Sequence, residues 1–255
     1  MVFLEREIVK KTGWIWLGMS ALVLFSLSPV PIQVWAWQGE VSQDHVSLGE
    51  VFQPAGFPLD AQPIRPLLAG DLQGDGGQER LALTSGLLTV LKGSQILWQS
   101  PQGWQVDQAA ITDLDHDGKP EVTLLVLRPF APWPIDRYIP NPGRISAFHD
   151  QHNQSCHLIL IGWRGGAMRE IWAGSALAEP VQSFSSAGPP GKEILITLDS
   201  LYALARTDPA RTMSAWEWNG FGFSLVSRLT GPFSKAVTLS SQQTTQNVYI
   251  LTSRR

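Results

Sequence analysis

Carboxylates gather in one short segment, Ile111–Val126, which reads ITDLDHDGKPEVTLLV. Asp113, Asp115 and Asp117 stand at alternate positions, and Gly118 follows them. Side chains at the first, third and fifth positions of a tight loop can point inward together, and glycine allows the bend that comes next. An all-oxygen site suits a hard cation such as Ca²⁺, which would offset the repulsion between the carboxylates. We therefore predict a calcium site in this loop.

Two more oxygen ligands would complete the predicted site. The backbone carbonyl of Lys119 supplies one, and the carboxylate of Glu121, at the ninth position, supplies the other. The twelfth position is Leu124, so the bidentate glutamate of an EF-hand is missing. The alternative is a polar turn without metal, because Asp and Gly are favoured in turns for purely local reasons.

An earlier segment, Leu67–Leu83, repeats the pattern 42 positions before the second copy (113 minus 71). Its candidate ligands are Asp71, Gln73, Asp75, Gly77 and Glu79. Gln73 replaces the middle aspartate and offers only an amide oxygen, so we expect weaker metal binding here. A third copy, Ser185–Glu193, keeps no aspartate and predicts a plain turn.

Short runs rich in β-branched and aromatic residues dominate the chain beyond Trp37, and Gly, Pro, Asn or Ser clusters separate them. The pattern predicts an all-β protein, and the repeat interval is about the length of a four-stranded propeller blade. We assign blades to residues 67–100, 109–175 and 181–229. The C-terminal runs AVTLSS and VYILTS would join the N-terminal runs VWAWQGE and VSLGEVFQ in a fourth blade, which closes the ring and removes its open edges.

These residues resemble the FG-GAP or VCBS repeats of the integrin-α-like β-propellers. In that family a strand leads into a loop of the form D-x-D-x-D-G-x-x-D, and a second strand leaves it. Asp113–Glu121 carries the resemblance well, and Asp71–Glu79 carries it in part. The resemblance implies a small β-propeller with structural Ca²⁺ in its loops. The seven blades usual in the family would not fit into residues 37–255, so we expect about four.

The first 36 residues predict an export signal or a membrane anchor. A basic start, MVFLEREIVKK, precedes the uncharged and apolar stretch Gly13–Val30, which predicts a hydrophobic helix at the low edge of spanning length. Cleavage after Ala36 would release a secreted or periplasmic domain of residues 37–255. Without cleavage, the helix would anchor that domain with the N-terminus in the cytoplasm.

A proline-rich segment, residues 128–144, interrupts the second predicted blade. Its five prolines lower the entropy cost of holding the aromatic side chains between them. Aromatic residues and arginine are the usual anchors of interfaces, so the segment predicts a binding loop. The candidate partner-binding residues are Phe130, Trp133, Arg137 and Tyr138. The alternative is an insertion that packs back over the propeller as a cover.

Composition and motifs argue against several kinds of partner, metal site and enzyme. The net charge of -3 and the lack of a basic run argue against a nucleic-acid partner. Cys156 is the only cysteine, so neither a disulfide scaffold nor a cysteine-rich zinc site fits. The histidine-rich segment HDQHNQSCH matches no standard zinc module. WAGSAL lacks the pattern of a nucleophile elbow, and GPPGKE lacks the hydroxyl residue that a phosphate loop needs.

We therefore predict an exported, non-catalytic, calcium-stabilised β-propeller that acts as a binding or accessory module outside the membrane. Its partner would be a protein or a glycan at the exported surface, and an uncleaved N-terminal helix would add contact with the membrane. One alternative is an extracytoplasmic hydrolase that uses paired carboxylates on the same scaffold. Another is a structural subunit of a membrane complex, held by its N-terminal helix.

Overall fold

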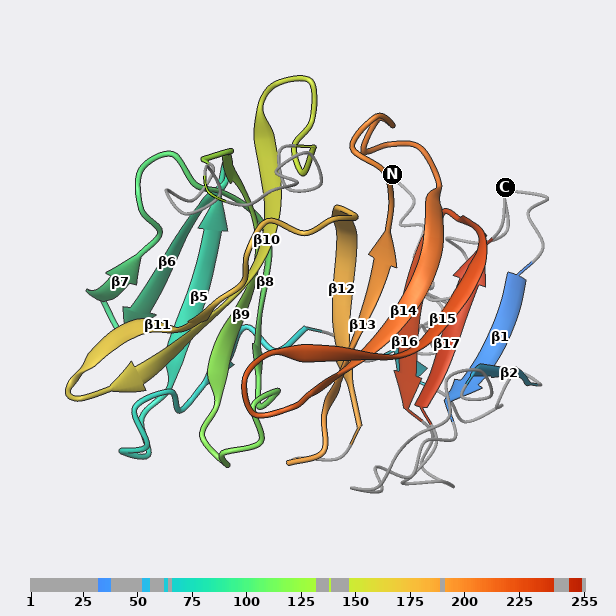
Figure 1. Cartoon of the computed structure of the whole chain (residues 1–255). Coiled ribbons are helices and arrows are strands. Elements are labelled where there is room, and N and C mark those ends of the chain that lie inside the picture. Colours follow the sequence, from blue (N-terminus) through green and yellow to red (C-terminus); the bar gives the residue numbers. More distant parts are fainter. Residues whose placement is uncertain are drawn as a thin grey trace, which may run out of the picture. The chain divides into compact units, whose positions relative to one another are not determined.

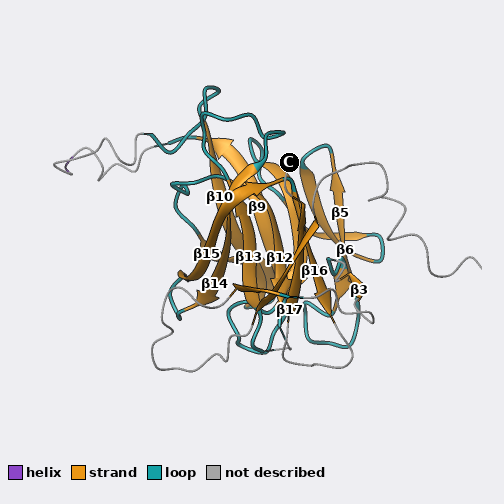
Figure 2. Ribbon diagram, turned by 90° about the vertical axis from the view of Figure 1, so that its right-hand side faces the viewer, coloured by secondary structure: helices purple, strands orange, loops and turns teal. Residues whose placement is uncertain are grey.

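The computed structural model describes residues 32–37, 52–55, 62–63, 66–131, 138, 147–188, 191–240 and 248–253. All of them belong to one unit, Pro31–Arg255. They form seventeen strands and no α-helix, so the all-β prediction is confirmed (Figures 1 and 2). Within these ranges no helix is long and apolar enough to span a bilayer. The predicted N-terminal hydrophobic helix lies outside the described residues.

Three antiparallel sheets each contain four strands that are consecutive in the chain. The first sheet consists of β4 (Ala69–Gly70), β5 (Glu79–Thr84), β6 (Leu87–Lys92) and β7 (Gln95–Gln99). The second sheet consists of β8 (Gln105–Thr112), β9 (Glu121–Pro129), β10 (Gln154–Arg164) and β11 (Ala167–Ala173). The third sheet consists of β12 (Val181–Ala187), β13 (Ile194–Asp199), β14 (Ala210–Trp218) and β15 (Phe223–Phe233). Their strands fall within or close to the three predicted blade segments.

A terminal sheet of five strands, in the order β2-β1-β17-β16-β3, joins residues from the two ends of the unit. Its strands are β1 (Ile32–Trp37), β2 (Phe52–Pro54), β3 (Gln62–Pro63), β16 (Lys235–Ser240) and β17 (Val248–Ser253). Ile32 pairs with Ser253 and Trp37 with Val248, so β1 is hydrogen-bonded to β17 along its whole length. The sequence predicted this joining of N- and C-terminal strands, but β3 was not expected. The pairings form four separate sheets and do not by themselves close a ring.

Neighbouring sheets pack face to face in chain order. Strands β5 and β6 contact β8, β12 contacts β8 and β9, and β12 also contacts β16. Figure 1 shows the first, second and third sheets following one another in this order. Buried apolar side chains fill the spaces between successive sheets, in three clusters. Burial of this apolar area is the main favourable term in folding.

Strand β9 shows why several runs in the sequence are continuously apolar. Side chains alternate between the two faces of a strand, so a strand buried on both faces needs apolar residues throughout. Val122 and Leu124 pack in the cluster shared with the first sheet, whereas Leu125 packs in the cluster shared with the third sheet. The loop that precedes β9 is therefore attached to one of the most buried strands of the unit.

Candidate functional site

Two loops of similar sequence lead into central strands of neighbouring sheets. The first acidic loop, residues 71–79, joins β4 to β5, and the second acidic loop, residues 113–121, joins β8 to β9. A buried leucine follows the first aspartate in each: Leu72 is 3% exposed and Leu114 is 0% exposed. These leucines belong to the core, so they fix the polar residues around them in place.

A fully buried glutamate ends each loop and begins the next strand. In the second loop, Glu121 Oε1 accepts hydrogen bonds from the Leu114 backbone N–H and the Thr112 hydroxyl, both at 2.7 Å. Its other oxygen, Oε2, is buried and has no hydrogen-bond partner among the described residues. Burial raises the pKa of Glu121 to about 8, the hydrogen bonds oppose this shift, and the charges of Asp115 and Asp113 add to it. A cation beside Oε2 would supply the missing partner.

The three aspartates of the second loop form the acidic cluster that the sequence predicts. One carboxylate oxygen from each of Asp113, Asp115 and Asp117 lies within 4.8 Å of the others. Each also accepts a backbone N–H of the same loop: Asp113 Oδ1 from Gly118 at 3.3 Å, Asp115 Oδ1 from Asp117 at 3.3 Å, and Asp117 Oδ1 from Lys119 at 2.9 Å. Gly118 has a φ of 76°, a left-handed conformation that glycine adopts without strain.

Arg164, the last residue of β10, partly neutralises this cluster. Its Nη2 lies 2.6 Å from Asp117 Oδ2 and 3.8 Å from Asp115 Oδ2. Among the described residues, the ion pairs of this guanidinium are with Asp115 and Asp117, so Asp113 and Glu121 have no direct counter-charge there. Burial raises the pKa of Asp115, and the charge of Asp117 adds to that effect.

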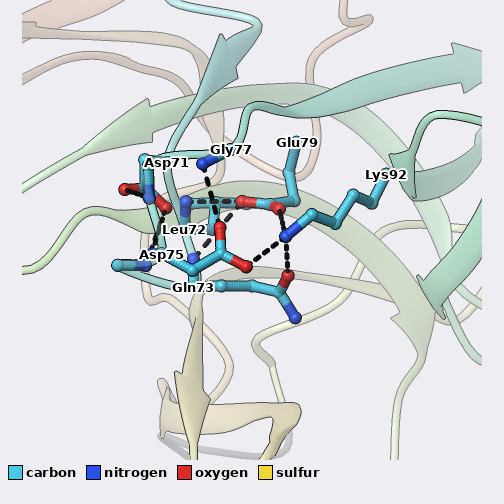
Figure 3. A network of polar contacts seen from close by, with 9 residues as sticks. Asp71, Leu72, Gln73, Asp75, Gly77, Glu79 and Lys92 are labelled. Carbon is cyan, nitrogen blue, oxygen red and sulfur yellow. Dashed lines mark hydrogen bonds and ion pairs between the residues drawn. The ribbon is translucent and has the colours of Figure 1, made fainter.

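The ammonium group of Lys92, the last residue of β6, lies against the first acidic loop (Figure 3). Lys92 Nζ donates a short hydrogen bond to Asp75 Oδ2, lies 2.5 Å from Gln73 Oε1 and forms an ion pair with Glu79 Oε1 at 3.4 Å. The hydrogen bond between Lys92 and Asp75 lowers the pKa of Asp75 and raises the pKa of Lys92. Three of the five predicted metal ligands therefore converge on a lysine.

The other two predicted ligands of the first loop are engaged with its backbone. Asp71 Oδ1 accepts the N–H groups of Gly74 at 2.7 Å and Asp75 at 3.1 Å, and its Oδ2 accepts that of Gly76 at 2.8 Å. The N–H of Gly77 donates to Asp75 Oδ1 at 2.9 Å. This geometry stabilises the loop without a metal ion.

Sheet register explains why the two loops differ. Lys92 is directly opposite Glu79 in the pairing of β5 with β6, so its side chain reaches the buried carboxylate. In the second sheet the pairing of β9 with β10 ends at Val122 opposite Ile161. The residue that follows Ile161 is Gly162, which has no side chain to fill the corresponding place. The orphaned oxygen of Glu121 is the equivalent of the Glu79 oxygen that faces Lys92.

The predicted binding loop, residues 128–144, is described only in part. Phe130 is half-buried, and its ring centroid lies 4.9 Å from that of His149. Tyr138 is 77% exposed. Trp133 and Arg137 lie outside the described residues. The structure therefore places one candidate aromatic residue against a neighbouring ring and another on the surface.

Sequence reasoning missed a cavity of about 700 Å³ between the second and third sheets. Trp172 of β11, Trp216 of β14 and Phe223 of β15 line it, together with a rim residue, Phe221. Trp216, Phe221 and Phe223 are close together in the chain, but Trp172 stands 44 positions before Trp216 (216 minus 172), so no local spacing connects the two walls. Their signal in the sequence is the tryptophan content of REIWAGS and SAWEWNG, which a buried strand would also show.

Comparison with known proteins adds no family to this description. No family model matches the chain, and no curated protein is significantly similar to it. The resemblance to FG-GAP or VCBS repeats therefore depends on the loop residues themselves.

Proposed function

We propose that the chain is a non-catalytic binding module of the small β-propeller type, exported or anchored outside the membrane, with Ca²⁺ in its second acidic loop. The observation that carries the metal is the buried, unpartnered Oε2 of Glu121 beside three clustered aspartates. In the first loop a lysine ammonium faces the equivalent oxygen, which supports a cation at the same place in the second loop. We do not extend the calcium proposal to the first loop, because Lys92 already occupies three of its five candidate ligands.

The proposed ion has a structural role. Hydrogen bonds hold the carboxylates of both loops to the backbone of the same loop, and the two buried glutamates begin core strands. An ion in the second loop would tie Asp113 and Glu121 together across the turn between β8 and β9. Exported compartments supply Ca²⁺ at concentrations that fill sites of moderate affinity, which fits the proposed location.

The proposal also includes closure of the propeller and export of the protein. The terminal sheet pairs β1 with β17, and this pairing would close a ring of four sheets. The pairing of β1 also limits where the N-terminal segment could be cleaved. Since β1 begins at Ile32, removal of residues 1–36 would take away five of its six residues. We therefore place any cleavage before Ile32, which intact-mass measurement of the exported protein would test.

Thermal melting in Ca²⁺ and in chelator tests the metal. At a free Ca²⁺ concentration about 100-fold above Kd, a single site adds about 2.7 kcal/mol to the free energy of unfolding. We expect Asp113→Asn to abolish this gain and Asp71→Asn, the matched change in the first loop, to preserve it. If chelator leaves the melting temperature of the unmodified protein unchanged, the calcium proposal is wrong.

A further inference from the structure

Side chains from the second and third sheets converge around one cavity. Its volume of about 700 Å³ lies in the range typical of small-molecule sites. Strands β10 and β11 contribute one wall, β13, β14 and β15 contribute the other, and the segment 174–179 lies between them. None of the acidic-loop residues lines it, so it is distinct from the proposed metal site.

A rigid aromatic surface forms one part of the cavity. The rings of Trp172 and Phe223 meet edge to face, with centroids 5.2 Å apart, and Trp218 packs against both at 5.8 and 5.3 Å. This geometry is favourable for aromatic rings and holds the two lining rings in place before any ligand arrives. Gly222 lies against Trp172: a Cβ atom there would be 3.5 Å from the indole.

The cavity is also lined by charged groups. Arg228 Nη2 lies 2.9 Å from Glu179 Oε2 and 3.9 Å from Asp199 Oδ2, and the guanidinium carbon lies 5.9 Å from the centre of the Trp216 ring. Asp199 is 2% exposed and accepts hydrogen bonds from the hydroxyls of Thr212 and Ser214. Glu179 is half-buried and Arg228 is exposed, so both remain accessible to a bound molecule.

We propose that this cavity binds a neutral, hydroxyl-rich ring compound, in practice a short glycan. One face of such a ring presents C–H groups, which pack against the electron-rich faces of aromatic rings. Its hydroxyls both donate and accept, which suits a carboxylate and a guanidinium held side by side. The inference deepens the proposed binding function by naming the ligand class, and it depends on that function being one of recognition.

The charges of the cavity disfavour other ligand classes. Two carboxylates and one guanidinium leave a formal excess of one negative charge, which opposes an anionic ligand. A wholly apolar ligand would cover the Glu179–Arg228 pair without replacing its hydrogen bonds to water, and that desolvation is costly. A cationic ligand would have to bind beside the guanidinium of Arg228.

Titration with neutral oligosaccharides tests the proposal. The probes are soluble glucan, xylan and chitin fragments, measured by calorimetry and by tryptophan fluorescence in saturating Ca²⁺. We expect Phe221→Ala, at an 87% exposed rim position, and Glu179→Gln each to weaken binding roughly ten-fold or more while melting stays unchanged. Ile96→Ala, a 57% exposed apolar residue of β7 outside the cavity, is the matched control and should bind normally.

Three results would overturn the inference: no binding of any neutral fragment at millimolar concentration, equal binding by all variants, or binding only of a quaternary ammonium or an apolar dye. Calcium-dependent melting and oligosaccharide binding are independent measurements. A protein that melts higher in Ca²⁺ yet binds no oligosaccharide would contradict the glycan inference alone. One that binds oligosaccharide without any calcium effect would contradict the metal proposal alone.

Discussion

Acid should destabilise this protein through His157, a residue of β10 that is 4% exposed. Its Nδ1 lies 3.0 Å from the Gly174 carbonyl oxygen, and its Nε2 lies 2.7 Å from the Ser155 hydroxyl. Burial lowers the pKa of His157 from 6.5 to about 4; the hydrogen bond to Gly174 opposes this shift, and the charge of Arg128 adds to it. Because the folded protein keeps the ring neutral, this contribution to stability is complete above pH 6.5 and is lost as the pH falls from 6.5 toward 4.

The size of the effect follows from the two pKa values. A difference of about 2.5 units corresponds to about 3 kcal/mol over the full window, and about 2.5 kcal/mol of it is lost by about pH 4.5. Urea denaturation at about pH 7.5 and about pH 4.5 should compare the wild type with His157→Gln, whose amide can donate to Gly174 but does not titrate. We expect the free energy of unfolding of the wild type to fall by about 2.5 kcal/mol more than that of the variant.

Comparing the wild type with His157→Gln isolates the contribution of His157 to the pH dependence of stability. Burial raises the pKa of Glu121, Glu193 and Asp199, and these groups titrate in the wild type and the variant alike, so they cancel in the difference. His152→Gln, at an exposed position of the same segment, is the control and should follow the wild type. Parallel pH profiles for the wild type and His157→Gln would refute the reasoning.

Three further predictions follow from the loops and the core. Lys92→Met should lower the melting temperature, because buried Glu79 then loses the ammonium group that faces it, and Lys92→Arg should recover much of the loss; equal melting of all three proteins would contradict this. Leu114→Ala should reduce the free energy of unfolding in urea by about 2–5 kcal/mol, since Leu114 is fully buried in the core. A loss well below this range would contradict tight packing around Leu114, because neighbouring side chains would then have filled the cavity that it leaves. Burial raises the pKa of the Cys156 thiol to about 12, so a disulfide reagent at mildly alkaline pH should react with it only after unfolding; rapid reaction of the folded protein would be inconsistent with this burial.

Strand content could be predicted from the sequence because each strand depends mainly on local composition. The run EVTLLVLR became β9 and CHLILIGW became β10, each bounded by turn residues as expected. Pairing of the terminal strands was predicted from their similarity to the third and fourth strands of other units, and the register of β1 with β17 agrees with it. The short strand β3 gave no such signal, since Gln62 and Pro63 are not typical strand residues.

The acidic loops show where local reasoning fails. Spacing alone predicted that Asp113, Asp115 and Asp117 would cluster, and they do. The same spacing could not reveal Lys92, because a lysine 17 positions after Asp75 (92 minus 75) reaches it only through the register of β5 with β6. Long-range contacts of this kind decide whether a loop needs an external cation. The aromatic cavity was missed for the same reason, since its walls come from two sheets.

The terminal sheet also sets an order of assembly. The first three sheets use strands that are neighbours in the chain, so each can form as soon as its own segment is available. Ile32 and Ser253, by contrast, are 221 positions apart (253 minus 32), so their pairing must await synthesis of β17 and carries the entropy cost of closing a very long loop. Until then the backbone groups of β1 that pair with β17 have no partner in this sheet. Formation of the terminal sheet thus reports that β17 has been made: a product cut off before Val248 would leave the β17-facing edge of β1 unpaired, a feature by which proteases and chaperones could distinguish it from a chain that contains β17.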